Sequence, residues 1–303
     1  MVNPGKVNPT NQQAKEDEMA PEKIAILVDS CTDVPKEYRE KYHMYVAPLT
    51  IVYKDAEYRD GIDIQPEDVF ARFAEEIPST SLPSPAVVGD IFKQIAADGY
   101  DKVIAVLISS GLSGTFETVS SFGPAPEGLE ARYIDTKNIG IGSGFSAIRA
   151  GELIEQGLPF AEVCEGVEDA ARHTTLLFCV STLEYLMKGG RIGLVAGVMG
   201  TLLDLKPVIS CNEEGVYYTV AKARGRKKSL GLALEKAVEY AAGAKEYNLT
   251  VMHGAAKEEA GALMAALKER LPDFRIAIEG QITPALVVHT GPGLIGIGIQ
   301  RLA

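Results

Sequence analysis

The chain has 303 residues, of which 46% are hydrophobic and 23% are charged, as expected of a globular protein long enough for two domains. Its formal net charge of −11 argues against a nucleic-acid partner, because a phosphate backbone repels an acidic protein. No apolar run approaches membrane-spanning length, and none resembles a secretory signal. The four cysteines are far apart and form no CxxC pair, which favours reduced thiols in a cytoplasmic protein.

The first half of the chain alternates buried apolar runs with amphipathic segments, after a polar segment 1–20 that predicts a disordered tail. The expected strands are 23–30, 44–53 (with a proline inside it), 101–110 and 130–136, and the expected helices are 66–77, 85–99 and 111–122. Residues 141–172 are expected to be mainly helical. This alternation predicts an N-terminal α/β domain, a three-layer parallel sheet covered by helices on both faces.

The second half mixes strand-like and helical segments in a different rhythm. Strands are expected at 174–181, 206–212, 216–223 and 247–254, helices at 226–243 and 257–270, and three more strand-like runs follow to the end of the chain. The glycine turn in "CNEEGVYY" predicts a hairpin. We therefore expect two α/β domains, an N-terminal domain at 21–157 and a C-terminal mixed-sheet domain at 158–303.

Two nucleotide-binding motifs can be set aside. "GPGLIG" (291–296) matches the dinucleotide fingerprint, but the few residues that follow it leave no room for the helix that must hold the pyrophosphate. The chain contains no Walker motif G-x-x-x-x-G-K-[ST].

"SSGLSGTF" (109–116) lies where a parallel strand is expected to lead into a helix, which is where open α/β sheets bind ligands. Gly114 allows close approach of the backbone, and the hydroxyls of Ser113 and Thr115 join the free N–H groups of the helix start in a candidate anion site. A plain serine cap on the helix is the alternative.

"IPSTSLPSP" (77–85) is too polar and too rich in proline for a strand or a helix interior, so it predicts a rigid loop. Thr80 and Ser81 in this loop are candidates to face the same ligand as Ser113, although an ordinary loop and helix cap explain the stretch equally well. Asp29, at the end of the first strand, is either a group that orients hydroxyls or a turn residue.

His289 ends an apolar run, and a lone histidine is more often structural than functional. Paired with Ser113 and an aspartate it would indicate a serine hydrolase, but the local string Gly-Leu-Ser-Gly-Thr is not the G-x-S-x-G elbow. Cations gather at Lys188, Arg191 and "KARGRKK" (222–228), which forms either a solvated face or a site for a phosphate or an acidic partner.

Taken together, these stretches resemble the DegV family, bacterial lipid-binding proteins similar to the acyl-carrying subunit of fatty acid kinase. The resemblance rests on an ordered set that covers nearly the whole chain from residue 23: "VDSCTD", "TSLPSP", "SSGLSGTF", "YIDT", "LEYLMKGGRI", "KPVI", "KARGRKK" and "HTGPG". The chain departs from the family's "TSQPS" at Leu82, where the family usually has a polar residue.

The resemblance implies a long-chain fatty acid held between two α/β domains. Its carboxylate would be bound by a set of hydroxyl, backbone and imidazole groups: Thr80, Ser81, Ser113, Gly114, Thr115 and His289. A separate ATP-dependent kinase subunit would phosphorylate the acyl group, for phospholipid synthesis, with Arg224 and Arg191 facing the kinase or the phosphate. The protein would then be a carrier with no catalytic residues of its own, no metal and no cofactor.

The residues fit this expectation physically, because a carboxylate suits a glycine and hydroxyl nest at a helix start, and a protonated or donor His289 would strengthen the grip. The apolar segment 194–205 is a candidate wall for the acyl slot, with ordinary core as its alternative; the candidate slot residues are Val195, Val198, Met199 and Leu202. Two enzymes remain as alternatives, a serine hydrolase using Ser113 and His289 and a phosphotransferase resembling dihydroxyacetone kinase.

Overall fold

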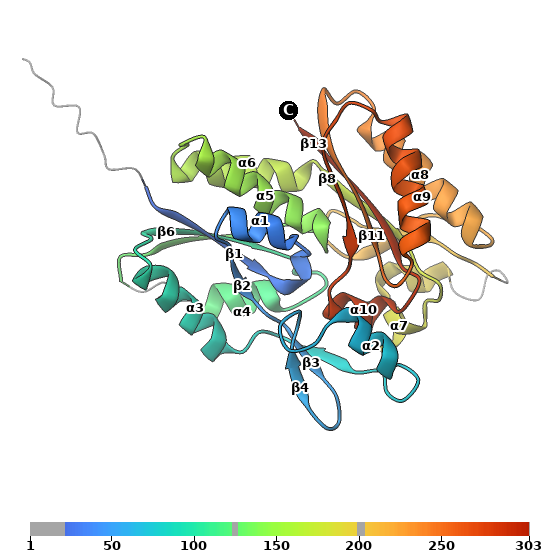
Figure 1. The fold of residues 1–303 in the computed structure, drawn as a ribbon, viewed down its shortest axis with the longest axis horizontal. Helices are drawn as coiled ribbons and strands as arrows, with labels where there is room; N and C mark the ends of the chain where they lie inside the picture. Colours follow the sequence, from blue (N-terminus) through green and yellow to red (C-terminus); the bar gives the residue numbers. More distant parts are fainter. Residues whose placement is uncertain (1–21, 123–126, 199–203, 303) are drawn as a thin grey trace, which may run out of the picture.

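The computed structural model describes residues 22–122, 127–198 and 204–302. The predicted tail at 1–20 therefore lies outside the described residues. Figure 1 shows two α/β domains side by side, with the N-terminal half of the chain in blue and green and the C-terminal half in orange and red. The fold class predicted from the sequence, a parallel-sheet domain followed by a mixed-sheet domain, is confirmed.

The first sheet contains four parallel strands in the order β2-β1-β6-β7. Their bounds are Tyr45–Ala47 (β2), Ile24–Asp29 (β1), Lys102–Leu107 (β6) and Glu130–Asp135 (β7). Alternate residues of β1 face opposite layers, as the twofold period of a strand requires. Leu27 packs in the cluster with the helices α3 (Pro85–Ala97) and α4 (Thr115–Phe122), whereas Ile26 packs in the cluster that contains α5 (Ile141–Glu155).

The prediction of a single strand at 44–53 was wrong, because Pro48 separates two strands, β2 and β3 (Thr50–Val52). Proline cannot donate to a strand ladder, and the next amide, Leu49 N–H, donates to Ser30 Oγ instead. β3 is the centre of a small antiparallel sheet with β4 (Glu57–Arg59) and β5 (Ser79–Ser81). The polar stretch around Thr80 is therefore an edge strand, not the irregular loop that its composition predicts, since an edge position tolerates hydroxyl side chains and flanking prolines.

The second sheet has six strands in the order β10-β9-β8-β13-β11-β12, with only the β11/β12 pair parallel. Their bounds are Thr174–Cys179 (β8), Val208–Cys211 (β9), Tyr217–Ala221 (β10), Glu246–His253 (β11), Phe274–Gln281 (β12) and Ile295–Leu302 (β13). The predicted hairpin is confirmed as β9 and β10. Helices α8 (Arg226–Ala241) and α9 (Lys257–Arg270) cover one face, and α5 lies against the other face, which turns toward the first domain (Figure 1).

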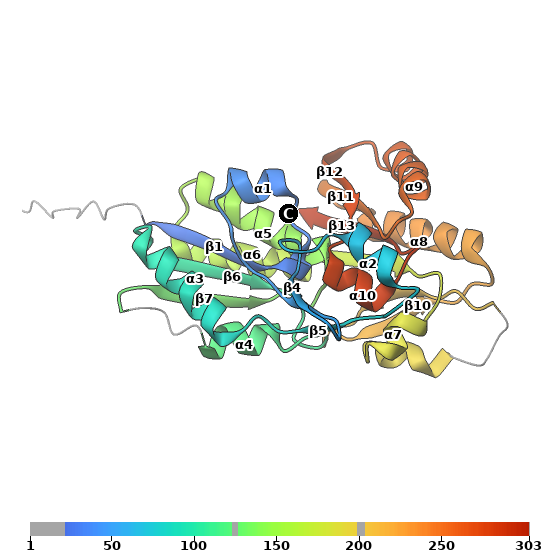
Figure 2. The same cartoon turned by 60° about the horizontal axis from the view of Figure 1, so that its bottom comes forward.

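One of the three strand-like runs expected near the C-terminus is instead a helix, α10 (Pro284–Thr290). Pro284 occupies the first turn, where its missing N–H costs nothing, and Gly291 ends the helix at a φ of 69°, which glycine adopts without strain. Figure 2 shows α10 between the second sheet and the small sheet, beside α2 (Pro66–Arg72) and α7 (Glu184–Lys188). This helix therefore connects the C-terminal domain to the N-terminal segment that carries Thr80.

The remaining elements are short or peripheral. Helix α6 (Phe160–Arg172) packs along α5, and α1 (Lys36–Lys41) lies on the same side of the first sheet (Figure 1). The described residues also contain the 3₁₀ turns η1 (Ser30–Thr32) after β1 and η2 (Gly193–Val198) beside β10.

Candidate functional site

Thr80 and His289 meet at the contact between the small sheet and α10. Thr80 Oγ1 lies 2.7 Å from His289 Nε2, within hydrogen-bond distance. β5 holds Thr80 in place through its pairing with Ile51 of β3, and α10 presents His289 from its last turn. Two of the residues expected to bind a carboxylate are thus in direct contact, although they lie far apart in the sequence.

The His289 imidazole is neutral at neutral pH. Burial, together with the nearby charge of Arg191, lowers the pKa of His289 from 6.5 to about 4. Within the described residues, His289 Nδ1 is buried and has no hydrogen-bond partner. A Cβ at Gly189 would lie only 2.1 Å from Nδ1, so glycine at this position lets the end of α7 close over the ring. The protonated form considered from the sequence is therefore the disfavoured one in the ligand-free protein.

Ser113 caps the start of α4. Its Oγ accepts a hydrogen bond from Thr115 N–H at 3.3 Å and lies 2.8 Å from Thr115 Oγ1. Thr115 is buried, whereas Ser113 is partly accessible. Among the described residues, Ser113 makes no hydrogen bond to Thr80 or to His289. A serine hydrolase needs its nucleophile and base in contact, so this arrangement does not favour that alternative.

The two hydroxyl-bearing segments nevertheless lie against each other. A Cβ at Gly114 would lie 3.2 Å from the Leu82 side chain, which places the chain just after β5 beside the start of α4. Ser81 is exposed and pairs in register with Thr50. The chain from Thr80 to Leu82 therefore runs from the His289 contact to the α4 start.

Arg191 connects the α7 segment to the loop before α4. Its Nε donates to Leu112 O at 3.3 Å, and one terminal nitrogen donates to Gly189 O at 2.5 Å. Arg191 thus lies beside both predicted halves of the carboxylate site. Arg224 is exposed in the segment between β10 and α8, where its backbone bridges to Leu205.

The first turn of α10 is held by two buried carboxyl groups of the N-terminal domain. Thr283 N–H donates to Asp33 Oδ1 at 3.0 Å, and Ala285 N–H donates to Asp60 Oδ1 at 2.9 Å. Burial raises the pKa of Asp33 to about 8 and that of Asp60 to about 6. Asp29, the last residue of β1, is buried and caps the turn that follows, and its carboxyl accepts from Cys31 N–H and Ile108 N–H. No motif in the sequence connects Asp33 and Asp60 with α10.

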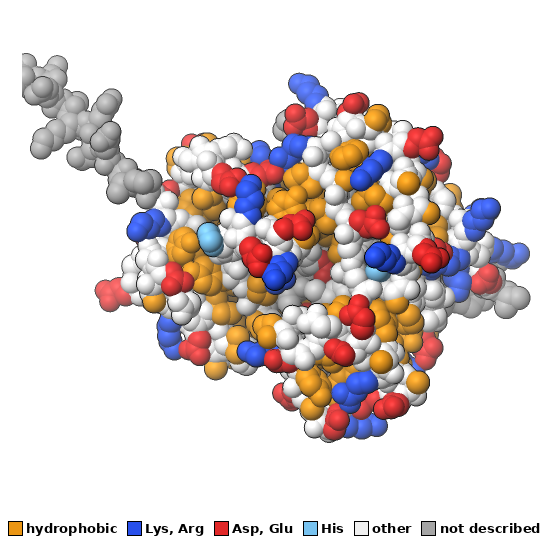
Figure 3. Space-filling view, viewed as in Figure 1, with side chains coloured by type: hydrophobic (Ala, Val, Ile, Leu, Met, Phe, Trp, Pro, Cys, Tyr) orange, Lys and Arg blue, Asp and Glu red, His pale blue; other side chains and the backbone are white. Residues whose placement is uncertain are grey.

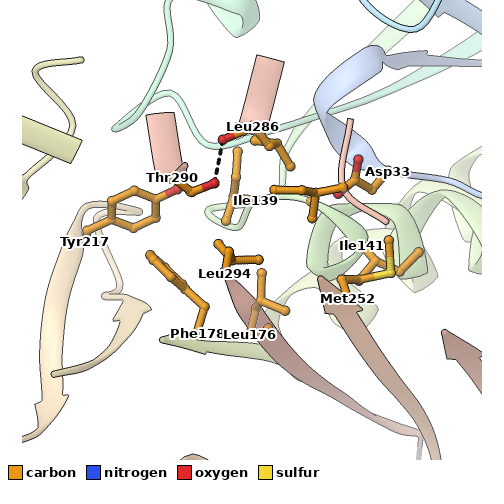
Figure 4. Close-up of a pocket in the computed structure, with 13 residues that line it drawn as sticks. Asp33, Ile139, Ile141, Leu176, Phe178, Tyr217, Met252, Leu286, Thr290 and Leu294 are labelled. Atoms are coloured by element: carbon orange, nitrogen blue, oxygen red, sulfur yellow. Dashed lines mark hydrogen bonds between the residues drawn. The ribbon is translucent and has the colours of Figure 1, made fainter. Parts of the chain in front are cut away.

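A small apolar cavity of about 30 Å³ lies between the two domains, beside α10. Figure 4 shows side chains from both domains converging on it. Most are hydrocarbon or aromatic, and its lining includes Ile139, Ile141, Leu176, Phe178, Tyr217, Met252, Leu286 and Leu294. Thr290, next to His289 in sequence, also lines the cavity. The cavity therefore reaches the last turn of α10, which also carries His289.

The predicted acyl-slot residues lie partly elsewhere. Val195 is buried in the same hydrophobic cluster as the cavity residues but does not line the cavity. Val198 ends η2, and its side chain is not described, while Met199 and Leu202 lie outside the described residues. Sequence reasoning missed the cavity lining, although its signals were present: Leu176 and Phe178 alternate on β8, and Leu286 and Thr290 are four apart on α10.

Other functional classes receive no support from the described residues. Among them no group of His, Cys, Asp and Glu is arranged to hold a metal ion. In the same segments no helix combines the length and the apolar character needed to cross a bilayer. On the face shown in Figure 3, acidic and basic side chains are interspersed, which gives no extended basic surface for a nucleic acid there.

The structure is that of a two-domain α/β protein with an apolar cavity between its domains. Residues 23–302 match the model of a family described as "Uncharacterised protein, DegV family". A DegV domain-containing protein of Clostridium acetobutylicum is 41% identical over 280 residues, which cover 92% of this chain and 99% of the relative. The chain belongs to the DegV family.

Solved structures of the family share the fold. A DegV family protein of Thermus thermophilus, described as fatty acid binding, has a TM-score of 0.84 at 30% identity, with 92% of this chain and 100% of that chain covered. DegV of Bacillus subtilis, described as a fatty acid binding protein, has a TM-score of 0.85 at 26% identity, with coverages of 93% and 100%. A stearic acid-binding protein of Eubacterium ventriosum has a TM-score of 0.82 at 27% identity, with coverages of 92% and 98%.

Proposed function

We propose that this protein binds a long-chain fatty acid, with the hydrocarbon chain in the cavity between the domains and the carboxylate at the Thr80–His289 pair. The observation that carries the proposal is the position of the apolar cavity, whose lining residue Thr290 adjoins the partly buried His289. Relatives of the same fold described as fatty acid binding support the ligand class.

The carboxylate would be held by neutral donors near one cation. If His289 Nε2–H donates to Thr80 Oγ1, the Thr80 hydroxyl is free to donate to the carboxylate; the Ser113 hydroxyl is a second donor, and Arg191 adds positive charge close to the ring. Hydrogen bonds to a charged acceptor are stronger than neutral ones, at about 1.5–3 kcal/mol each. A buried pocket with this donor set favours an anion without needing a protonated histidine.

The hydrocarbon chain supplies the larger part of the binding free energy. Burial contributes about 0.8 kcal/mol per CH₂ group, before the cost of ordering the chain. The ligand-free cavity is narrow, so lining side chains such as Met252 and Leu286 must change rotamer to admit a long chain. η2 packs beside Tyr217, which lines the cavity, so we retain the η2 segment with Val195 as a neighbouring wall.

We further propose that the protein presents the carboxylate to a separate ATP-dependent kinase, which forms the acyl phosphate. Exposed hydrophobic side chains around the site support a docking surface: Leu82 is 38% exposed, Met187 42% and Leu194 63%. Arg224 is exposed and Arg191 lies beside His289, so the two arginines are the candidates to face the kinase or the transferred phosphate. The protein itself would act as a carrier, not as the catalyst.

Organic extraction of the purified protein followed by mass spectrometry tests the ligand. The proposal predicts about one fatty acid per chain, or stoichiometric uptake when a delipidated sample is titrated with oleic acid. Protein that takes up no fatty acid, yet hydrolyses an ester or consumes ATP alone, would establish an enzyme instead.

A further inference from the structure

The cavity contains one carboxyl group among its apolar side chains. Asp33 lines the cavity and is buried, with only 6% of its surface exposed. Its Oδ1 accepts the hydrogen bond from Thr283 N–H that holds the start of α10. The other oxygen, Oδ2, is buried and has no hydrogen-bond partner among the described residues. A structural cap needs only one of these two oxygens.

The free oxygen lies at a corner formed by cavity residues. A Cβ at Gly140 would be 3.2 Å from Asp33 Oδ2, 3.5 Å from the Leu286 side chain and 3.9 Å from that of Leu176. Gly140, Leu286 and Leu176 all line the cavity. The Thr283 hydroxyl lies close enough to lower the pKa of Asp33, but it makes no hydrogen bond of normal geometry and is itself buried without a partner.

An unpartnered buried carboxyl costs about 1–3 kcal/mol, so its position at an apolar cavity calls for a ligand atom that can bond to it. Burial raises the pKa of Asp33 to about 8. The group is therefore mostly a neutral carboxylic acid at neutral pH, able both to donate and to accept a hydrogen bond.

Asp33 lies away from the carboxylate site. In Figure 4, Tyr217 and Thr290 lie on one side of the cavity, and Asp33 and Met252 lie on the opposite side. Along α10, Thr283 and His289 are separated by about 9 Å of helix rise. A fatty acid with its carboxylate at His289 would therefore pass Asp33 near the middle of its chain, not at its head.

We propose that the cavity accepts fatty acids that carry a mid-chain oxygen, a hydroxyl or a keto group, and that Asp33 hydrogen-bonds this oxygen. The proposal rests on the proposed fatty-acid function and specifies the ligand class at that same site. An unsubstituted chain leaves Asp33 Oδ2 without a partner. With a hydroxylated chain, the Asp33 carboxyl and the ligand hydroxyl both form a hydrogen bond.

The test compares the affinities of 10-hydroxyoctadecanoic acid and octadecanoic acid for the delipidated full-length protein, at neutral pH, by calorimetry. One neutral hydrogen bond predicts that the hydroxylated acid binds about fivefold more tightly. Equal or weaker binding of the hydroxylated acid overturns the proposal, because a hydroxyl buried without a partner lowers affinity. If neither acid binds, the fatty-acid function itself fails, and this inference fails with it.

Two variants separate the cavity oxygen from the helix cap. Asp33→Gly removes the carboxyl, and glycine suits the positive φ of 50° at this position, so we expect the preference to reverse in favour of octadecanoic acid. Asp33→Asn keeps a donor at the cavity and is expected to keep the preference. Asp60→Gly is the matched control, since it removes the other carboxyl that holds α10 but does not line this cavity. If Asp60→Gly abolishes the preference for the hydroxylated acid as fully as Asp33→Gly does, the preference comes from the position of α10 and not from the Asp33 carboxyl. That result would overturn the proposal.

Discussion

The hydroxyl of Thr80 lies 2.7 Å from Nε2 of His289, although 209 residues separate them in the chain. Thr80 belongs to a three-residue edge strand of the N-terminal half, and His289 belongs to the last turn of α10. This contact therefore places the head of the proposed ligand where the two halves of the chain meet. It also means that each half contributes a donor, so neither half alone forms the proposed site.

Replacement of Thr80 by valine tests this contact directly. Thr80→Val keeps the β-branched shape but removes the hydroxyl, and we expect about tenfold weaker fatty-acid binding from the loss of one hydrogen bond to a carboxylate. Isothermal titration with oleic acid measures the change. Ser79→Ala, on the same strand but exposed, is the control and is expected to leave affinity unchanged. An affinity for Thr80→Val equal to that of the wild type would remove Thr80 from the site.

Ser113→Ala separates a binding role from a capping role. We expect it to weaken oleic acid binding and also to lower the free energy of unfolding by about 1 kcal/mol, because Thr115 N–H loses its acceptor. Ser84 provides a matched comparison, since it caps α3 by accepting from Val87 N–H. Ser84→Ala should lower stability by a similar amount without affecting affinity. If both variants bind oleic acid as tightly as the wild type, Ser113 is only a helix cap.

Much of the fold follows from local patterns that the sequence displays. The parallel strand β1 and the β9/β10 hairpin have the apolar and glycine patterns typical of such elements, and both formed as predicted. The helix α10 was not predicted from the hydrophobic pattern, because "ALVVHT" is short and apolar, and such a run fits a strand as well as a buried helix. Its helical state depends on the tertiary contacts of Asp33 and Asp60 with its first turn, which no local window contains.

The candidate site was predicted only in part for the same reason. Hydroxyl and glycine residues such as Thr80 and Ser113 stand out in the sequence because their chemistry is unusual among apolar neighbours. The cavity residues, such as Phe178 and Leu294, are ordinary core residues in sequence, and only the packing of two sheets and α10 leaves space between them.

The stability of the protein should depend on His289 below neutral pH. The pKa of His289 is about 4 in the folded state and 6.5 in the unfolded chain. Between these pH values the unfolded chain binds a proton at His289 and the folded chain does not. This contribution is complete above pH 6.5 and is lost as the pH falls toward 4, by about 3 kcal/mol in total. Urea unfolding of wild type and His289→Gln at several pH values measures it, and the variant is expected to lose less stability over this range.

The comparison with His289→Gln is needed because buried carboxyl groups act in the opposite direction. The pKa values of Asp29 and Asp33 are raised by burial from 3.8 to about 7 and about 8, so their contribution is complete at low pH and is lost as the pH rises. These groups are present in both proteins, and the difference between the two curves isolates the histidine. Parallel curves from pH 4 to pH 6.5 would show that His289 titrates normally.

Arg224→Ala should separate binding from presentation. Arg224 is exposed and its backbone pairs with Leu205, so fatty-acid affinity is expected to stay the same. Acyl-phosphate formation by the kinase is expected to slow at least tenfold if this cation engages the partner or the phosphate. Lys236→Ala removes a surface cation from α8 and is the control. Normal phosphorylation kinetics with Arg224→Ala would exclude this arginine from the kinase interaction.

The central claim is that the cavity between the domains holds the hydrocarbon chain, and Gly296→Val tests it most directly. Gly296 lines the cavity from β13, and a Cβ there would meet the Leu176 and Phe178 side chains at ordinary distances of 3.7 and 3.8 Å, so the strand can accept a side chain that fills the space. The decisive measurement is the dissociation constant of oleic acid for this variant, with the fold checked by circular dichroism. The account predicts a folded protein whose affinity falls at least tenfold; a folded variant that binds oleic acid as tightly as the wild type would contradict it.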